Sequence, residues 1–117
     1  MDKNGVTFLL GSDAPQVFNV PGFSIHHEMQ EMANAGISNF KILQSGTSNP
    51  ADFFDATDEY GVVKVGAKAD LILLNGNPLN DISQAKNIAG VMLRKRWMSK
   101  EFIDSELEKI ATRYREE

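Results

Sequence analysis

The sequence predicts a mixed α/β fold, which becomes α+β when the chain is considered as an isolated fragment. Three observations predict it. An apolar, β-prone run at residues 6–10 stops at Gly11. A stretch rich in helix-capping signals follows, and then come short β-prone runs separated by glycine and asparagine turns. The last segment carries its apolar residues on one helical stripe.

The first predicted element is a strand at residues 6–10, buried on both faces, and Asp13 follows it closely. Barrel enzymes carry their catalytic groups where the barrel strands end, so Asp13 is the leading candidate for a catalytic residue. Aspartate between Gly11 and Pro15 is also ordinary turn chemistry, and the residues alone favour that structural role.

A turn at residues 15–22 precedes the first predicted helix, which covers about residues 25–35. Ser24 is its expected N-cap, because serine side chains accept hydrogen bonds from the free backbone N–H groups of a helix start. Gly36 is its expected left-handed C-cap.

Two shorter helices are expected next. Ser38 should cap the second helix, which ends where Ser45 and Gly46 interrupt the apolar pattern. Asn49 should cap the third helix, with Pro50 at its first position, where the missing N–H of proline costs nothing.

The composition then changes to short extended runs. Residues 61–66 and 69–74 predict two strands that pair as a hairpin, and residues 90–93 and 97–98 predict two more. From residue 99 onward the spacing predicts an amphipathic helix, whose apolar stripe should pack on the sheet or on a second copy of the chain.

Composition excludes several classes of function. The 117 residues include 42% hydrophobic and 24% charged residues, with no apolar run of the roughly 20 residues that cross a bilayer, so no membrane partner is expected. A net charge of −4 argues against a nucleic-acid partner. The absence of cysteine excludes disulfides and thiolate metal sites, and a start without signal-peptide character favours a cytoplasmic location.

Other candidate site residues have stronger structural explanations. His26 and His27 are adjacent, so on a helix they point about 100° apart and lack the spacing of a zinc pair. Ser12 lacks a nucleophile elbow, and we expect it to be a hydrogen-bonding neighbour of Asp13. Asp70 should stabilise a hairpin turn or the start of a strand. Residues 61–66 lack the spacing of a phosphate-binding loop.

Four motifs in one unbroken order give the chain a family resemblance over roughly residues 5–98. The chain resembles the C-terminal part of metal-dependent amidohydrolases, especially imidazolonepropionase-like and dipeptidase-like members. The motifs are Gly-Ser-Asp-Ala-Pro at 11–15, Ala-Gly at 35–36, Thr-Ser-Asn-Pro-Ala at 47–51, and the Gly-Val-Val-Lys-Val-Gly-Ala-Lys-Ala-Asp-Leu-Ile-Leu-Leu run at 61–74.

The resemblance implies a domain organisation. Residues 1–58 would be the end of the hydrolase barrel, contributing the last strand and following helices of a TIM-type barrel. Residues 59–98 would be part of the flanking small β-sandwich, and residues 99–117 a C-terminal amphipathic helix. A complete barrel needs about 250 residues, so a chain of 117 residues would hold only part of one.

The resemblance also implies a site. Asp13 would be the aspartate that binds the divalent metal, foremost zinc, and that handles the proton of the attacking water in the complete enzyme. The other ligands of the family, a His-x-His pair and further histidines, would lie upstream of Met1. One carboxylate binds a transition metal poorly, so we expect no metal on the isolated chain.

The predicted function is that of the C-terminal region of an enzyme that hydrolyses an amide or cyclic amide C–N bond of a small-molecule substrate with a metal-activated water. The isolated chain should be inactive, and homo-oligomerisation by element swapping is expected. The alternative is a non-catalytic oligomerising or binding module derived from such an enzyme, because an unpaired strand at residues 6–10 would invite pairing with another chain.

Overall fold

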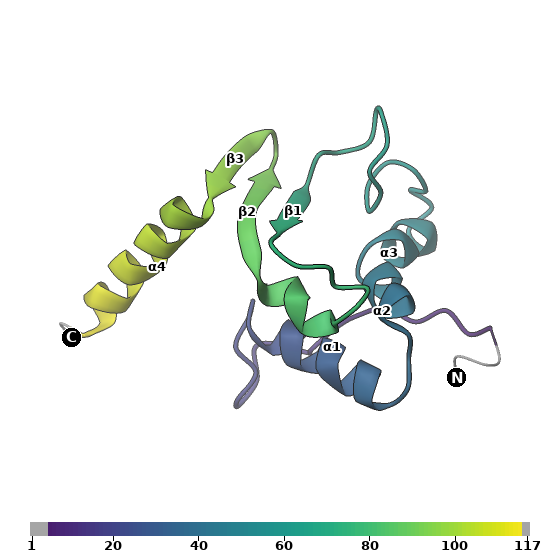
Figure 1. Cartoon of the computed structure of the whole chain (residues 1–117), viewed down its shortest axis with the longest axis horizontal. Helices are drawn as coiled ribbons and strands as arrows, with labels where there is room; N and C mark the ends of the chain where they lie inside the picture. Colours follow the sequence, from purple (N-terminus) through teal and green to yellow (C-terminus); the bar gives the residue numbers. More distant parts are fainter. Residues whose placement is uncertain (1–4, 116–117) are drawn as a thin grey trace.

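The computed structural model describes residues 5–115, in which three short helices lead into a small sheet and a long final helix (Figure 1). The mixed α/β class is confirmed. The elements in chain order are α1 (Ser24–Asn34), α2 (Asn39–Ser45), α3 (Ser48–Phe53), β1 (Leu71–Leu74), the 3-10 helix η2 (Ile82–Lys86), β2 (Ile88–Leu93), β3 (Arg96–Ser99) and α4 (Lys100–Arg115).

The sheet has three antiparallel strands in the order β1-β2-β3. A two-residue turn, Arg94 and Lys95, joins β2 to β3, and both residues adopt positive φ angles of 50° and 68°. Two left-handed residues give a hairpin turn whose twist matches that of the strands it connects. The strands expected at residues 90–93 and 97–98 are therefore confirmed as a hairpin.

The strand predicted at residues 61–66 is wrong, and so is the hairpin that was to join it to residues 69–74. β1 pairs with β2 instead, with Leu71 opposite Met92. The 61–66 segment forms bends and a turn, and the side chains of Val63 and Val65 are almost fully exposed. A β-prone run forms a strand only when another strand lies beside it. Because β1 pairs with β2, it is not the partner of residues 61–66.

The strand predicted at residues 6–10 is also not formed in the described chain. The segment is extended, but it lies along α2 and α3 rather than beside another strand (Figure 1). It is held there by a hydrogen bond from the Leu10 N–H to the Ser45 carbonyl at 2.9 Å and by one from the Asn49 side chain to the Phe8 carbonyl at 3.1 Å. Residues 5–115 offer it no neighbouring strand.

Two predicted N-caps lie inside their helices. Ser24 is the first residue of α1, and its hydroxyl donates to the Val20 carbonyl at 3.0 Å instead of capping. Asn49 lies within α3, which begins one residue earlier, so its amide is free to bond the extended segment. Gly36 has the expected left-handed conformation after α1, with φ of 88°. Ser38 occupies the N-cap position of α2 as predicted, but its side chain makes no capping hydrogen bond.

The buried core is small. The side chains that are almost completely buried come from α2, α3 and η2, and they are Ile42, Ser45, Ala51, Ile82 and Ala85. The accessible surface is 8833 Å², whereas a compact monomer of this mass exposes about 6,300 Å². The radius of gyration is 15.8 Å, against about 13 Å for a compact domain of this length. Roughly 2,500 Å² of surface therefore exceeds what a self-contained domain would expose.

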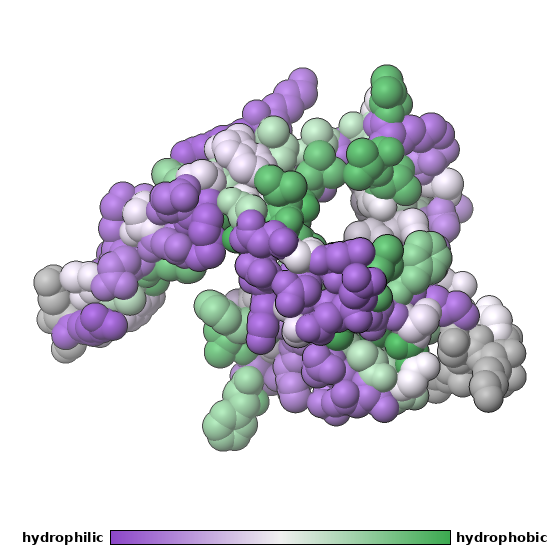
Figure 2. All heavy atoms as spheres, viewed as in Figure 1, coloured by the Kyte–Doolittle hydropathy of each residue, from purple (hydrophilic) through white to green (hydrophobic). Residues whose placement is uncertain are grey.

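Apolar residues contribute to this excess. Figure 2 shows apolar residues on both sides of an opening between the sheet and the long segment that follows α3. Phe53 and Phe54 stack edge to face at 5.1 Å between ring centroids, yet about two thirds of each side chain stays exposed. Within residues 5–115, no helix combines the length and the apolar character needed to cross a membrane.

Candidate functional site

The extended segment places Asp13 at the start of a closed loop. Leu10 packs against Gly46, where an added Cβ would approach the Leu10 Cδ2 atom to 3.0 Å. Together with the hydrogen bond from Leu10 to Ser45, this contact fixes the end of the segment at the junction between α2 and α3. Asp13 follows three residues later, at the point where the chain turns toward α1.

The loop after Asp13 is held by backbone and side-chain hydrogen bonds. Gln16 and Asn19 form an isolated antiparallel bridge, in which the Asn19 N–H donates to the Gln16 carbonyl at 2.9 Å. The Asn19 side chain also donates to the Ser12 carbonyl at 3.0 Å, and the hydroxyls of Ser12 and Ser24 lie 2.9 Å apart. This network ties both ends of the loop to the start of α1.

Asp13 has an unusual backbone and one side-chain partner. Its φ angle is 52°, in the left-handed region that aspartate adopts more readily than most residues. Its Oδ2 atom accepts a hydrogen bond from the Nε2 atom of Gln16, and the residue is exposed. The neutral amide orients the carboxylate without neutralising its charge.

Two details of this loop differ from the sequence prediction. The hydroxyl of Ser12, expected to bond Asp13, bonds Ser24 instead. Gln16, which the sequence reasoning did not single out, is the side chain that contacts the carboxylate. The available signal was spacing, because a residue three positions after Asp13 across a turn with Pro15 lies within reach of the aspartate side chain.

The two histidines of α1 differ in environment, in keeping with the structural role predicted for them. His26 is partly buried where α1 packs on η2, and its pKa is lowered from 6.5 by burial and, to a lesser extent, by the nearby Lys86 ammonium. His27 is exposed. Within residues 5–115, no three His, Asp or Glu side chains are grouped so that they could hold a metal ion.

Asp70 has the structural role expected for it, but in a different turn. Its Oδ1 atom accepts a hydrogen bond from the Arg94 N–H at 2.8 Å. Arg94 starts the turn between β2 and β3, so Asp70 holds the end of that hairpin against the start of β1. The Asp70 carboxylate therefore has a structural role in this hairpin.

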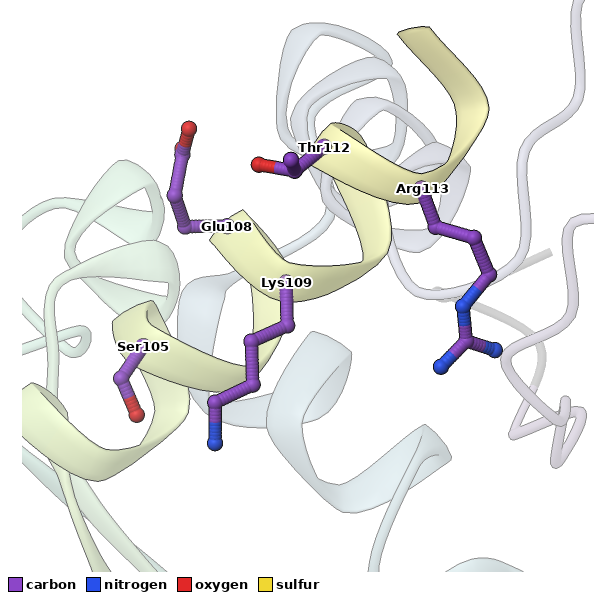
Figure 3. Close-up of a pocket in the computed structure, with 5 residues that line it drawn as sticks. All are labelled: Ser105, Glu108, Lys109, Thr112 and Arg113. Carbon is purple, nitrogen blue, oxygen red and sulfur yellow. The ribbon is translucent and has the colours of Figure 1, made fainter. Parts of the chain in front are cut away.

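Asp13 lines neither of two hollows on the described surface. One of them runs along α4 and is lined by Ser105, Glu108, Lys109, Thr112 and Arg113. Figure 3 shows that Glu108 rises from one side of the helix while Lys109 and Arg113 hang from the other, so the groups do not converge on a ligand. A second hollow lies beside residues 5–8, with Lys41, Gln44 and Asn49.

A divalent metal would not be held by the described residues alone. A catalytic zinc takes three protein ligands, and the region around Asp13 contributes one exposed carboxylate. The arrangement supplies one exposed carboxylate oriented by an amide hydrogen bond. It does not supply a ligand set or an enclosed pocket.

The model of the amidohydrolase family matches residues 1–98. Among solved structures, a protein assigned as a prolidase from Bifidobacterium longum is 27% identical with a TM-score of 0.74, and the match covers 92% of this chain and 28% of that chain. A molinate hydrolase is 28% identical with a TM-score of 0.69, covering 82% and 24%. A Xaa-Pro dipeptidase with bound methionine is 31% identical with a TM-score of 0.59, covering 64% and 18%.

A search of curated protein sequences gave no significant match. The chain spans less than a third of the length of each of these three solved structures. The final helix, α4, lies beyond the residues that the family model matches.

Proposed function

Because the chain belongs to the amidohydrolase family, we propose that it is the C-terminal region of an enzyme that hydrolyses an amide or cyclic amide C–N bond of a small molecule with a metal-activated water. The observation that carries the proposal is the family match over residues 1–98, which includes Asp13. The surface excess of roughly 2,500 Å² supports it, because a part of a larger fold exposes apolar faces that the remainder covers.

Asp13 is the residue to which we assign acid-base chemistry. Its carboxylate would accept a proton from the attacking water and return it to the leaving nitrogen, the two transfers that C–N hydrolysis requires. In the complete enzyme it would also be one ligand of a divalent metal, foremost zinc, and that metal would lower the pKa of bound water toward ~7. The hydrogen bond from Gln16 would keep the carboxylate oriented for the transfer.

The organisation that supports this role follows the family resemblance. Residues 1–58 would complete a TIM-type barrel, residues 59–98 would join a small β-sandwich, and residues 99–117 would follow as a separate helix. The exposed edge of β1, where more than half of the Ile72 and Leu73 side chains is accessible, leaves room for a further strand.

The similar solved structures suggest a second class of substrate. Two of them are assigned as a prolidase and a Xaa-Pro dipeptidase, so dipeptides ending in proline are a second candidate substrate class. A panel of cyclic amides, simple amides and Xaa-Pro dipeptides, tested on the complete enzyme, would separate the two classes by their kcat/KM values.

The test has two arms. The 117-residue chain, purified and supplied with zinc or manganese, should turn over none of these substrates and should retain no tightly bound metal. In a polypeptide that also carries the upstream reading frame, Asp13→Asn should lower kcat by about 10³-fold or more while the protein stays folded. Turnover by the short chain, or full activity of the Asp13→Asn enzyme, contradicts the proposal.

A non-catalytic oligomerising module remains the second candidate function, and the exposed apolar surface is the observation that favours it. The reading frame upstream of Met1 separates the two. A His-x-His motif encoded there supports the enzyme, whereas a stop codon directly upstream supports the module.

A further inference from the structure

The apolar stripe of α4 has the spacing of a coiled-coil seam. Ile103, Leu107, Ile110 and Tyr114 follow one another at intervals of four, three and four residues, which is the a/d pattern of two heptads. Leu107 is 49% exposed, Ile110 50% and Tyr114 72%. Most of this seam is therefore not used within the chain.

The helix is fixed at its start and projects from the body elsewhere. The guanidinium of Arg96 lies over the Phe102 ring, 5.2 Å from its centroid, and α4 contacts β2 and β3. Beyond this base the helix extends away from the sheet (Figure 1). With 16 residues it is about 24 Å long, so the projecting part offers a partner nearly two turns of open seam.

The charges beside the seam are arranged asymmetrically. In residues 100–107 the acidic side chains outnumber the single basic one, and in residues 108–115 the basic side chains outnumber the single acidic one. The charged residues are Lys100, Glu101, Asp104 and Glu106 in the first half, then Glu108, Lys109, Arg113 and Arg115 in the second. The helix macrodipole favours such a bias in any single helix. The macrodipole does not, however, require charged residues to lie beside an exposed apolar seam. Glu106 and Arg113 both lie beside the seam, at equivalent positions one heptad apart.

We propose that α4 pairs with α4 of a second copy of this chain, antiparallel, about a two-fold axis between Leu107 and Ile110. Leu107 then faces Ile110 of the second copy, and Ile103 faces Tyr114 of the second copy. Glu106 lies beside Arg113 of the second copy, and the two-fold repeats this ion pair. A two-fold interface of this kind is self-complementary and closed.

The charges select the antiparallel orientation over the parallel one. In a parallel pair, Glu106 would neighbour Ala111 of the second copy and Arg113 would have no acidic neighbour among the described residues of the other helix. The acidic first halves would also lie side by side. The inference goes beyond the proposed hydrolase function and uses neither Asp13 nor a metal, so the two can fail separately.

The first test is the mass of the full chain in solution, measured by sedimentation over a series of concentrations. Wild type should dimerise, and Leu107→Glu should be monomeric at every concentration in the series. Thr112→Glu adds the same charge on the polar side of the helix shown in Figure 3, and should dimerise like wild type. A monomeric wild type, or dimers that Leu107→Glu leaves intact, overturns the proposal.

Exchange of charges tests the geometry. Glu106→Arg and Arg113→Glu should each weaken self-association by about tenfold, because each replaces two attractions by two repulsions. An equimolar mixture of the two variants should restore wild-type affinity as a heterodimer, since both cross-pairs are then attractive. Lys109→Ala controls for the loss of the Lys109–Glu106 pair within the helix, at 2.5 Å. No recovery in the mixture overturns the proposal.

Cross-linking gives a separate measurement, because it reports which residues of the two helices meet. The chain has no cysteine, so introduced thiols have no background. A mixture of Ile103→Cys and Tyr114→Cys chains should form a disulfide between the two variants, while Ile103→Cys alone should not. Cross-linking of Ile103→Cys to itself would indicate a parallel pair and would overturn the antiparallel assignment.

Discussion

Gln16 donates a hydrogen bond from its Nε2 atom to the Oδ2 atom of Asp13, across a turn that begins with a left-handed aspartate. This contact orients the proposed acid-base group through a neutral amide. Gln16 is therefore a positioning residue in the proposed mechanism, and its role can be separated from that of Asp13.

Replacing Gln16 by Ala should lower kcat of the complete enzyme about tenfold and leave KM within about twofold, because one orienting hydrogen bond is lost while substrate contacts remain. Steady-state kinetics measure both constants. Gln30→Ala, an exposed glutamine on α1 that bonds Asn34, is the matched control and should change neither. Unchanged kcat in Gln16→Ala would remove Gln16 from the mechanism.

The hydrogen bond from the Arg94 N–H to Asp70 joins the turn between β2 and β3 to the start of β1. Asp70→Ala should destabilise the chain by about 1 kcal/mol, because the Arg94 N–H loses a charge-assisted acceptor at the hairpin turn. Asp70→Asn keeps an oxygen at the same place and should cost less. Urea unfolding measures both free energies, and equal effects of the two substitutions would show that the bond is unimportant.

Local signals predicted the elements whose partners lie close in sequence. The β2–β3 hairpin needs only a two-residue turn, and α4 needs only its own periodicity, so both were predicted with small errors in their ends. The cap at Gly36 also depends on one residue and its neighbours.

The elements that failed depend on distant partners. Residues 61–66 are as β-prone as β1, but β1 pairs with β2, which begins 14 residues after it ends. Residues 6–10 are extended and lack a neighbouring strand within residues 5–115. Propensity states that a segment can be a strand, whereas the fold decides which strand it pairs with.

The candidate site shows the same division. The place of Asp13 after an apolar run made it a candidate, because that signal is local, but the residues alone favoured a structural role and the family resemblance selected it. Its acid-base role stays a prediction. Its contact with Gln16 depends on the turn geometry and on the bridge between Gln16 and Asn19, neither of which the residue types specify. The hydrogen bond from the Asn49 side chain to the Phe8 carbonyl joins residues 41 positions apart, so the sequence could not predict it either.

The turn before the sheet offers a matched pair of glycines. Gly61 has a φ of 75°, and a Cβ there would lie 2.2 Å from the Thr47 carbonyl oxygen, while Gly66 has a φ of 94° with no atom within 4 Å of a Cβ. Gly66→Ala should cost about 1–2 kcal/mol from backbone strain alone. Gly61→Ala should cost at least about 1 kcal/mol more, because backbone atoms must also move.

Chemical denaturation of the two glycine variants under the same conditions measures the difference. The comparison cancels the backbone cost that both substitutions share, so the remaining difference reports the contact between the 61–66 segment and the start of α3. Equal stabilities would mean that Gly61 does not approach Thr47 closely in solution.

The partly buried His26 should make stability depend on pH. Its folded pKa lies below the 6.5 of the free side chain, because burial disfavours the charged ring and Lys86 on η2 repels it. The unfolded chain therefore binds the proton more readily, so stability is complete above about pH 6.5 and is lost as the pH falls toward the folded pKa. The measurement is the urea midpoint of unfolding at a series of pH values from 7.5 down to 5.5. As the pH falls, the midpoint should decline in wild type and in His27→Gln, and it should decline less in His26→Gln. In Lys86→Ala the decline should be intermediate, because the burial of His26 still lowers its pKa when the Lys86 charge is gone. A His26→Gln slope equal to that of wild type would assign the decline to other groups.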